Sequence, residues 1–540
     1  MVENQEYFLK PSVQMEPLVN RWYAWPHLVA PTTAALNVAN LHLKIMRSFV
    51  SAPQVHAAAL KKPSMRGGPF LDLDPSRVGE VRDFIDRTSR EQAQMIQFAE
   101  GVKCLNEMLE TEATGPSLEP LYQKVPDILK GYIELVYDLH NHPSARYLER
   151  LLYKSPFYDE SLQAIELSLI HDDGRPFVFS TPRFDDERHL RINMPFRSKS
   201  FDELFKLRHT PAPFYFIKQQ LALDDELDDR LLSFLTTEPP TRRPSRFEGN
   251  GIRIRYLNHA CILVETREVS IMTDPIVSYE YESDVYRYTF ADLPESIDYV
   301  LLTHTHNDHV VLESLLQIRH KIGTVLVPRS GGGALEDPSI KLVLENIGFQ
   351  NVTEIDELES IDIPGGSVTG VPFFGEHGDL NIRSKIAHLI TLNGTKILCA
   401  ADSRNIEFKL YERLHGLIGD VDILFLGMEC DGAPLSWMYG ALCTKPLDRK
   451  MDQTRRLNGS DFEKGIDIVN RFNCRRAYVY AMGQEPWLSF LTSIKYTDES
   501  RPIVESNRLI EACRSQGIIS ERLYGATEIM LDVNGNGHRD

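Results

Sequence analysis

"THTHNDHV", residues 303–310, places three histidines and an aspartate directly after the apolar segment "IDYVLL" at 297–302. An apolar segment of this length is typical of a buried β-strand. In an extended chain, residues two positions apart point to the same face, so His304 and His306 can bind one metal ion. The spacing favours a metal site over the alternative of a surface turn with solvated histidines.

The second half of the motif is directed at a second ion. Asn307 suits the cap of a helix predicted at 309–320, which places Asp308 and His309 on the turn that follows the strand. Two adjacent metal ions are therefore the natural interpretation.

The residues around the motif predict an α/β domain. From residue 251 onward, short apolar segments of strand character follow one another, several of them separated by helical stretches. Upstream, "TEPPTRRPSR" at 237–246 contains three prolines among polar residues and interrupts regular structure. We therefore place a domain boundary there, with domains at residues 1–245 and 246–540.

The first domain is predicted to be a mixed, helix-rich α+β domain. Residues 33–60, 76–110 and 117–140 carry apolar residues at three- and four-residue spacing, which indicates amphipathic helices. Residues 162–181 indicate two strands joined by a turn at Asp173 and Gly174.

Composition limits the classes of protein to consider. A chain of 540 residues exceeds what one hydrophobic core organises, and its formal net charge of −18 disfavours a nucleic-acid partner. No apolar run approaches the roughly 20 residues of a membrane-spanning helix. "MVENQEYFLK" at the start lacks the features of a secretory signal, so we expect a cytoplasmic protein without a membrane segment. Seven dispersed cysteines argue against a disulfide framework.

The H-x-H-x-D-H spacing, with "NHACILVE" at 258–265 and "TDP" at 273–275 upstream, resembles the metallo-β-lactamase superfamily over roughly residues 250–530. The resemblance implies an αββα sandwich with the metals at one edge. Asp274 matches a position whose carboxylate orients the ring of a metal-ligating histidine without binding the metal itself. A simple turn aspartate is the alternative for Asp274.

Later ligands are expected where further strands end. Asp402 fits the carboxylate that bridges the two metals in the superfamily, and "GEHGD" at 375–379 offers both Glu376 and His377 for a position that is usually histidine. Neighbours on a strand point in opposite directions, so only one of the two should bind, and spacing alone does not choose between them. The late histidine of the hydrolases is missing, since only His415 and His538 follow Asp402.

If Glu376 is the ligand, three imidazoles and three carboxylates surround the metals. Such oxygen-rich ligation suits iron or manganese better than a structural zinc site, although zinc also accepts these ligands.

The glutamate, the missing histidine and the long helical N-terminal domain together resemble the metallo-β-lactamase-fold diiron β-hydroxylases of nonribosomal peptide and antibiotic biosynthesis, a family with a member in the chloramphenicol pathway. The resemblance implies an O2-dependent monooxygenase that hydroxylates the β-carbon of an amino acid. That amino acid is held as a thioester on the pantetheine arm of a synthetase carrier domain.

The resemblance also implies ligands and partners. His304, His306 and Glu376 would bind one iron of an oxo-bridged diiron cluster. Asp308 and His309 would bind the other iron, and Asp402 would bridge the two irons. Glu376 is preferred to His377 on this ground. The reaction needs an external electron donor, a separate reductase or ferredoxin, and the family's N-terminal domain implies a homodimer.

Two further predictions concern the C-terminal half. Glu429 follows another buried strand and is a candidate catalytic proton donor, with a structural glutamate as the alternative. The stretch at 431–459 is expected to line the route of the substrate, and its basic residues to dock an acidic carrier domain. A solvated loop is the alternative for these basic residues, which are Lys445, Arg449, Lys450, Arg455 and Arg456.

The competing function is a binuclear zinc metallohydrolase, in which a metal-bound hydroxide attacks a thioester, lactone or phosphodiester. It keeps the fold and most of the ligands. It predicts zinc, activity without O2, and His377 in place of Glu376.

Overall fold

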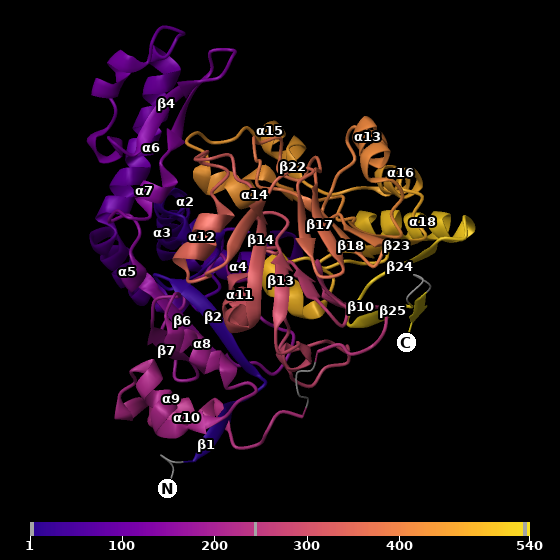
Figure 1. Ribbon diagram of the computed structural model, residues 1–540. Coiled ribbons are helices and arrows are strands. Elements are labelled where there is room, and N and C mark those ends of the chain that lie inside the picture. The colour runs from indigo at the N-terminus through magenta and orange to yellow at the C-terminus, as the bar shows by residue number, and fades with distance from the viewer. Residues whose placement is uncertain (1–4, 242–245, 533–536, 540) are drawn as a thin grey trace.

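The computed structural model describes residues 5–241, 246–532 and 537–539, and its C-terminal part is built on two facing sheets (Figure 1). The first sheet has the order β15-β14-β13-β12-β11-β10-β25-β26. Its strands are β10 (Ile252–Asn258), β11 (Cys261–Glu265), β12 (Ser270–Thr273), β13 (Ile297–Leu301), β14 (Ile322–Pro328), β15 (Val352–Ile355), β25 (Thr527–Leu531) and β26 (Gly537–Arg539). The second sheet has the order β16-β17-β18-β19-β20-β23-β24. Its strands are β16 (Ser360–Ile363), β17 (Gly366–Val371), β18 (Ala387–Leu392), β19 (Thr395–Cys399), β20 (Ile423–Gly427), β23 (Arg476–Tyr480) and β24 (Ile519–Arg522).

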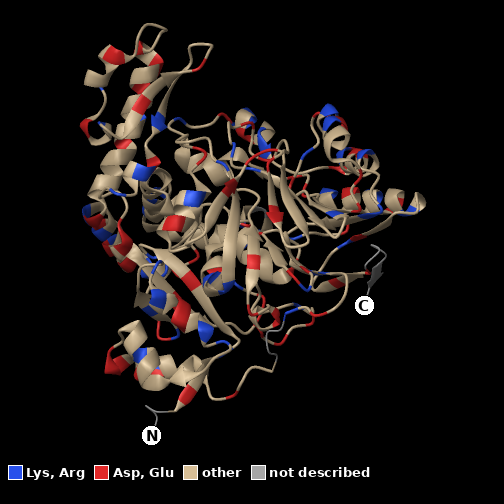
Figure 2. Ribbon diagram, in the orientation of Figure 1, with Lys and Arg blue, Asp and Glu red and all other residues tan. Residues whose placement is uncertain are grey.

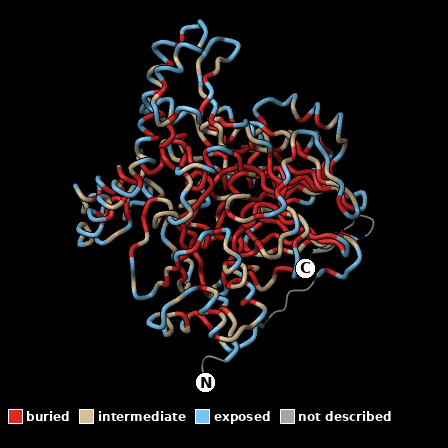
Figure 3. Tube along the Cα trace, turned by 60° about the vertical axis from the view of Figure 1, so that its left-hand side comes forward, coloured by how far each residue is buried: buried red, intermediate tan, exposed pale blue. Residues whose placement is uncertain are grey.

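Helices cover the outer faces of both sheets. One apolar core lies between the sheets, where Ile254 and Ile262 of the first pack with Ile390 and Phe425 of the second. Separate cores join each sheet to its own helices. These helices are α11 (Leu312–Ile318) and α12 (Ile340–Asn346) on the first sheet, and α13 (Lys409–Ile418), α16 (Phe462–Arg471) and α18 (Arg501–Ser515) on the second. The predicted four-layer αββα sandwich is confirmed. Its strands can be almost wholly apolar because each sheet is covered by helices on one face and by the other sheet on the second face. The buried trace concentrates there (Figure 3).

The N-terminal part is mixed α and β, as predicted. Its strands are β1 (Glu6–Leu9), β2 (Val13–Val19), β3 (Trp22–Tyr23), β4 (Ile133–Tyr137), β5 (Pro143–Tyr147), β6 (Gln163–Leu169), β7 (Leu190–Asn193), β8 (Ala212–Pro213) and β9 (Leu235–Thr236). Its helices are α1 (Pro26–Val29), α2 (Pro31–Asn37), α3 (Leu43–Ser51), α4 (Pro53–Leu60), α5 (Val78–Glu91), α6 (Ala93–Glu112), α7 (Glu149–Leu152), α8 (Lys199–Lys206), α9 (Phe214–Leu221) and α10 (Asp228–Ser233). A π-helical segment, η1 (Val38–His42), joins α2 to α3 without a break.

Two local predictions for this part are wrong. Residues 117–140 form short 3₁₀ turns and the strand β4 instead of a helix, because Pro120 and Pro126 interrupt helical hydrogen bonding. The segment after Gly174 is not a strand, and it runs across the surface of the C-terminal part, where Val178 N donates to Phe490 O at 3.0 Å.

The boundary predicted at 245/246 adjoins residues 242–245, which lie outside the described part of the chain. Within the described ranges, no helix is both long and apolar enough to cross a membrane. Charged residues concentrate on the peripheral helices and loops, and the central strands carry few of them (Figure 2).

Short helices complete the C-terminal part. These are α14 (Leu435–Tyr439), α15 (Arg449–Thr454) and α17 (Ser489–Thr492), and a two-stranded ribbon pairs β21 (Ala433–Pro434) with β22 (Arg456–Leu457). The apolar core of the N-terminal helices extends to α14, through Leu435, Met438 and Tyr439. The two parts of the chain therefore share a core.

Buried ion pairs also join the two parts. Arg175 binds Glu16 of β2 at 2.8 Å and Glu313 of α11 at 2.6 Å, and Arg183 forms a second pair with Glu16. Tyr23 donates to Glu313 at 2.8 Å. Since α11 directly follows the histidine motif, this network fixes the N-terminal part relative to that motif.

We expect Glu16→Gln to destabilise the protein, because the substitution leaves Arg175 and Arg183 buried without their shared carboxylate. Removing one partner of a buried ion pair costs about 3 kcal/mol or more. The midpoint of urea denaturation should fall. Glu134→Gln, which breaks an exposed pair with Arg146, is the matched control and should change it little. An unchanged midpoint for Glu16→Gln would contradict the role of the network.

The ion pairs of Glu16 with Arg175 and Arg183 also predict that the stability of the folded protein depends on pH. Burial alone would raise the pKa of Glu16, but Arg183 and Arg175 outweigh burial and lower it to about 2 from an ordinary value of 4.5. A depressed pKa stabilises the folded state above pH 4.5, and that contribution is lost as the pH falls from 4.5 to 2. The difference in urea midpoint between wild type and Glu16→Gln should therefore shrink across this window.

Candidate metal centre

The histidine motif follows β13 as a turn rather than as the start of a helix. His309 N and Val310 N donate to His306 O at 3.1 and 3.0 Å, and α11 begins only at Leu312. The prediction that Asn307 caps the helix is therefore wrong. The intervening turn directs the motif toward the edge of the sandwich where β12 and β19 also end, and strand ends that meet at one edge are the usual place for a site.

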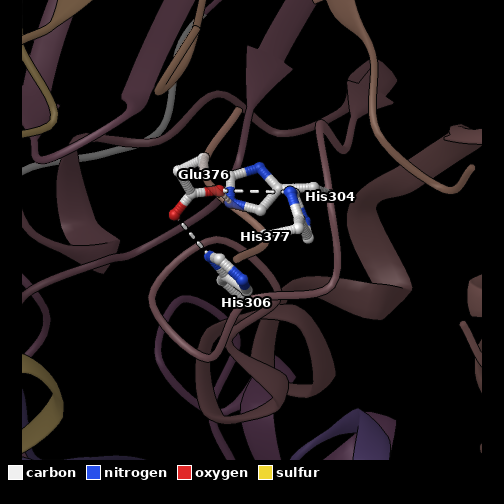
Figure 4. A group of neighbouring side chains, drawn as sticks. All are labelled: His304, His306, Glu376 and His377. Atoms are coloured by element: carbon white, nitrogen blue, oxygen red, sulfur yellow. Dashed lines mark ion pairs between the residues drawn. The ribbon is translucent and has the colours of Figure 1, made fainter. Parts of the chain in front are cut away.

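The first group of possible ligands is His304, His306, Glu376 and His377. One ligand atom from each lies within 4.8 Å of the others, and all four residues are buried. Glu376 faces both motif histidines (Figure 4), with Oε2 3.1 Å from His304 Nε2 and Oε1 2.6 Å from His306 Nδ1. We call this group the first position.

Both Glu376 and His377 face the site, so the argument that only one of two neighbours can do so does not hold. Residues 376–379 form a bend and turn instead of a strand, and Glu376 has a φ of 67°. His377 nevertheless makes fewer contacts with the group, since its Nδ1 lies 3.2 Å from Gly375 O and 3.7 Å from Glu376 Oε2. The contacts of Glu376 favour it as the ligand.

The second group, which we call the second position, joins Asp308 and His309 to His259. Asp308 Oδ2 lies 3.3 Å from His259 Nε2. His309 donates through Nδ1 to Asp274 Oδ2 at 2.8 Å, the expected contact of Asp274 with a histidine of the motif. Because that nitrogen is occupied, His309 presents Nε2 to the centre.

Asp402 lies between the two positions. Its Oδ2 is 2.9 Å from His309 Nε2 and 4.0 Å from His304 Nε2, and these three residues form a third overlapping group. A carboxylate at this place can bind both ions. All six predicted metal ligands are thus brought together, from segments far apart in the chain.

His259 was missed by the sequence analysis, although it lies within the stretch "NHACILVE" that carries the superfamily resemblance. It occupies the turn between β10 and β11 with a φ of 44°, and it is buried. Because no second histidine or carboxylate lies at a metal-binding spacing from it in the sequence, His259 could not be recognised as a possible ligand.

Contacts behind the ligands fix the orientation of their rings. Thr303 Oγ1 lies 3.0 Å from His304 Nδ1 and donates to Asp274 at 2.6 Å, so His304 directs Nε2 to the site. His306 Nε2 lies 3.2 Å from the hydroxyl of Tyr439 on α14. His306 therefore presents Nδ1 to Glu376, and α14 is coupled to the first position.

The residues fit bound cations. Four buried side-chain atoms at the centre make no hydrogen bond among the described residues, namely His304 Nε2, Glu376 Oε2, His377 Nε2 and Asp402 Oδ1, and the first two of these lie 3.1 Å apart without a hydrogen bond between them. Buried polar atoms without partners are costly, and a metal ion satisfies such atoms directly. The mixture of nitrogen and carboxylate oxygen donors suits iron.

The electrostatics of the centre reflect burial and crowding. Burial, with His309 and His306 adding to it, lowers the pKa of His304 well below its usual range, and burial raises the pKa of Asp402. Burial also acts to lower the pKa of His309, but the carboxylates of Asp402 and Asp274 raise it well above the usual range. The ring of His304 is thus neutral and free to donate a lone pair.

Backbone strain collects around the centre. His259, Asp274, Glu376 and Ala401 all have positive φ, between 32° and 67°. Non-glycine residues adopt this conformation at a cost, and such residues are frequent at functional sites.

The other predicted residues lie outside the three groups. Glu429 accepts from Gly432 N and lies 3.4 Å from the hydroxyl of Tyr496, and burial raises its pKa to about 7. Arg455 donates to Gly378 O at 2.7 Å, and Arg456 to Asp431 O at 2.5 Å. Both guanidinium groups therefore hold loops next to the site, whereas the sequence analysis expected them to dock an acidic carrier domain.

Comparison with known proteins places these features in a family. Residues 8–239 match the diiron non-heme beta-hydroxylase N-terminal domain, and residues 253–431 match the beta-lactamase superfamily domain. The 4-amino-L-phenylalanyl-[CmlP-peptidyl-carrier-protein] 3-hydroxylase of Streptomyces venezuelae is 38% identical over 530 residues, which is 96% of this chain and 98% of that protein.

Structural comparison agrees. The crystal structure of CmlA, a diiron beta-hydroxylase from Streptomyces venezuelae, superposes with a TM-score of 0.90 at 35% identity, covering 98% of this chain and 100% of that chain. A metal-dependent hydrolase of Thermococcus onnurineus is 26% identical but matches only 32% of this chain.

We expect Gly427→Ala to weaken metal binding at least tenfold, because a Cβ at this residue would lie 2.3 Å from Asp402 Oδ1 and would displace the carboxylate between the two positions. Metal content after dialysis measures this. Gly416→Ala on α13, where nothing lies within 4 Å, is the control. Full metal content in the Gly427 variant would show that Asp402 is not held as described.

We expect His259→Ala to weaken the second position selectively, by about 10- to 100-fold if His259 binds or orients a ligand there. Titration of the metal-free protein with Fe²⁺ should then show one strong and one weakened site. His171→Ala, at an exposed histidine, should retain both. Two unaltered sites in the His259 variant would remove this residue from the centre.

Proposed function

The chain belongs to the family of diiron non-haem β-hydroxylases, and we propose that it hydroxylates the β-carbon of an amino acid held as a thioester on a nonribosomal peptide synthetase carrier domain. The observation that carries the proposal is the position of Glu376, whose carboxylate contacts both His304 and His306. A carboxylate at this place gives the centre its oxygen-rich ligand set. The similar hydroxylase of Streptomyces venezuelae is described as acting on a carrier-bound 4-aminophenylalanyl group.

The centre binds two iron ions, as the family implies. We propose His304, His306 and Glu376 for the first, Asp308 and His309 for the second, and Asp402 as the bridge. When bound, a diiron centre supplies the reductive activation of O2 and the oxidising power to replace C–H by C–OH. The carboxylates stabilise the higher charge of oxidised iron, since anionic oxygen donors are the harder ligands.

The surrounding residues hold the ligands and keep bulk water out. His304 and His309 are fully buried, and Asp274 fixes the ring of His309 from behind. The N-terminal part covers α14, the helix that carries Tyr439, because its helices share a core with α14. Exclusion of water protects a reactive oxidant from wasteful reduction.

The reaction places one oxygen atom of O2 in the substrate and releases the other as water, so it consumes two electrons and two protons. We propose that a separate reductase or ferredoxin supplies the electrons. Glu429 is proposed as a proton donor, supported by its raised pKa near 7. The homodimer, the cytoplasmic location and the antibiotic pathway implied by the family are further proposals, as are the two domains at 1–245 and 246–540.

The zinc hydrolase is the weaker alternative. The metal-dependent hydrolase of Thermococcus onnurineus matches 32% of this chain, whereas the hydroxylase of Streptomyces venezuelae matches 96% of it. The N-terminal part, which the hydroxylase family shares, has no place in that alternative.

The test combines metal analysis with turnover. We expect about two irons per chain and an absorption band of oxo-bridged ferric iron in the purified protein. With a reductant, a carrier loaded with an aromatic amino acid should gain one oxygen atom, derived from isotopically labelled O2. Two zinc ions in a colourless protein that cleaves the thioester under argon would overturn the proposal.

Substitutions can show which of the neighbours Glu376 and His377 is the metal ligand in the first position. Glu376→Gln should lower iron content and hydroxylation at least tenfold, because an amide is a much poorer ligand than a carboxylate. His377→Gln should retain iron and the ferric absorption band. The opposite pattern would make His377 the ligand and would favour the hydrolase.

A further inference from the structure

A cavity of about 1060 Å³ lies between the N-terminal part and the segment 434–447. Its wall includes Asn307, which stands between His306 and Asp308 in the histidine motif, so the cavity reaches the motif beside the metal centre. Helix α14 forms part of the wall through Trp437 and Met438, and the next residue, Tyr439, contacts His306. The segment 431–459, which was expected to line the route of the substrate, contributes a large part of the wall of this cavity.

The cavity has a cationic rim. Four of its lining residues are Lys or Arg and only one, Asp452, is acidic, in a chain with a net charge of −18. Lys44 and Arg47 lie three residues apart on α3 and are exposed, and within the described residues neither has an ion pair. Lys103 of α6 also lines the cavity, and its one ion pair within the described residues is a 3.9 Å contact with Glu100. Three cations thus stand at the rim without a close partner.

The interior has a different character. Aromatic side chains form much of the wall, among them Trp25, Phe177 and Phe179. Two buried polar atoms in the wall have no hydrogen-bond partner among the described residues: the donor Trp22 Nε1 and the acceptor Asn307 Oδ1. Trp22 and Asn307 are 2% and 5% exposed, so their polar atoms need a ligand or water to bind.

We propose that this cavity holds the 4′-phosphopantetheine arm of the carrier, with its phosphate bound by Lys44, Arg47 and Lys103, an assignment that rests on the proposed function. The arm is anionic at one end, carries two amides along its length and ends in the thioester. These features match the cationic rim of the cavity, its unpartnered donor and acceptor, and the metal centre beside it. Phosphate contacts with Lys and Arg are charge-assisted and need no desolvated partner.

A second cavity of about 800 Å³ is the less suitable site. It shares Gly67, Gly68, Phe177 and Ser180 with the first, but its lining holds as many acidic as basic residues and none from 303–309. The basic residues are Arg66, Arg175, Lys495 and Arg522, and the acidic ones are Asp72, Asp173, Glu485 and Asp498. A phosphate would gain little from such a balanced wall.

The test compares binding of 4′-phosphopantetheine with binding of pantetheine, which lacks the phosphate, to the iron-loaded full chain. Trp22, Trp25 and Trp437 line the cavity and are three of the four tryptophans, so fluorescence reports binding, and calorimetry gives the affinity independently. At low salt, we expect the phosphate to increase affinity about tenfold, the effect of one to two charge-assisted contacts. Salt of about 0.5 M should remove most of this gain.

Lys44→Ala/Arg47→Ala should reduce the gain to under about twofold and leave pantetheine binding unchanged. Arg66→Ala/Lys495→Ala, which removes two exposed cations from the second cavity, should keep the full gain. The proposal fails if the native chain shows no gain, or if the two double variants lose it equally. Because no turnover is measured, failure of the proposed hydroxylation leaves this result standing, and the reverse also holds.

Discussion

Compensation of buried charge by cations is the constraint on which the rest of the structure depends. Asp308, Glu376 and Asp402 converge on three imidazoles at the edge of the sandwich, and two of the carboxylate oxygens, Glu376 Oε2 and Asp402 Oδ1, make no hydrogen bond within the described part of the chain. Carboxylates crowded in this way repel each other and lose hydration. Two iron ions resolve both problems, so the ligand groups, the strained turns and the supporting contacts of Asp274 and Thr303 form one arrangement.

The position of the N-terminal part also follows from the need to bury the metal centre. The sandwich alone leaves the first position beside α14, and the N-terminal helices cover that helix. The ion-pair network of Glu16, Arg175 and Glu313 then fixes these helices to the element that follows the motif. The cavity between the two parts is consequently enclosed by a wall whose position is tied to the metal ligands.

Sequence alone was sufficient where ligands are close together or end an apolar strand. The motif at 303–310 and Asp402 are of this kind, and the strands of the sandwich were readable because they are short, apolar and separated by turns. It was insufficient where local geometry departs from a regular strand. Glu376 and His377 both face the site because a turn with positive φ replaces the expected alternation, and His259 lies in a turn far upstream. Nor could periodicity show that tryptophans and cations of the N-terminal part line a cavity, since that depends on tertiary packing.

The π-helical segment η1 has a consequence for the cavity. Residues 39–42 of this segment and the rim cations of α3 belong to one uninterrupted helix that starts at Pro31. A π-turn holds one residue more than an α-turn, so it changes the angular phase of everything that follows it. Without that extra residue, α3 would be rotated by about 100°, the angle of one residue in an α-helix with 3.6 residues per turn. Lys44 and Arg47 would then leave the direction in which they now line the cavity. A single inserted residue in the backbone therefore sets two directions at once: that of the charged rim, and that of the face which α3 buries through Leu43, Met46 and Phe49.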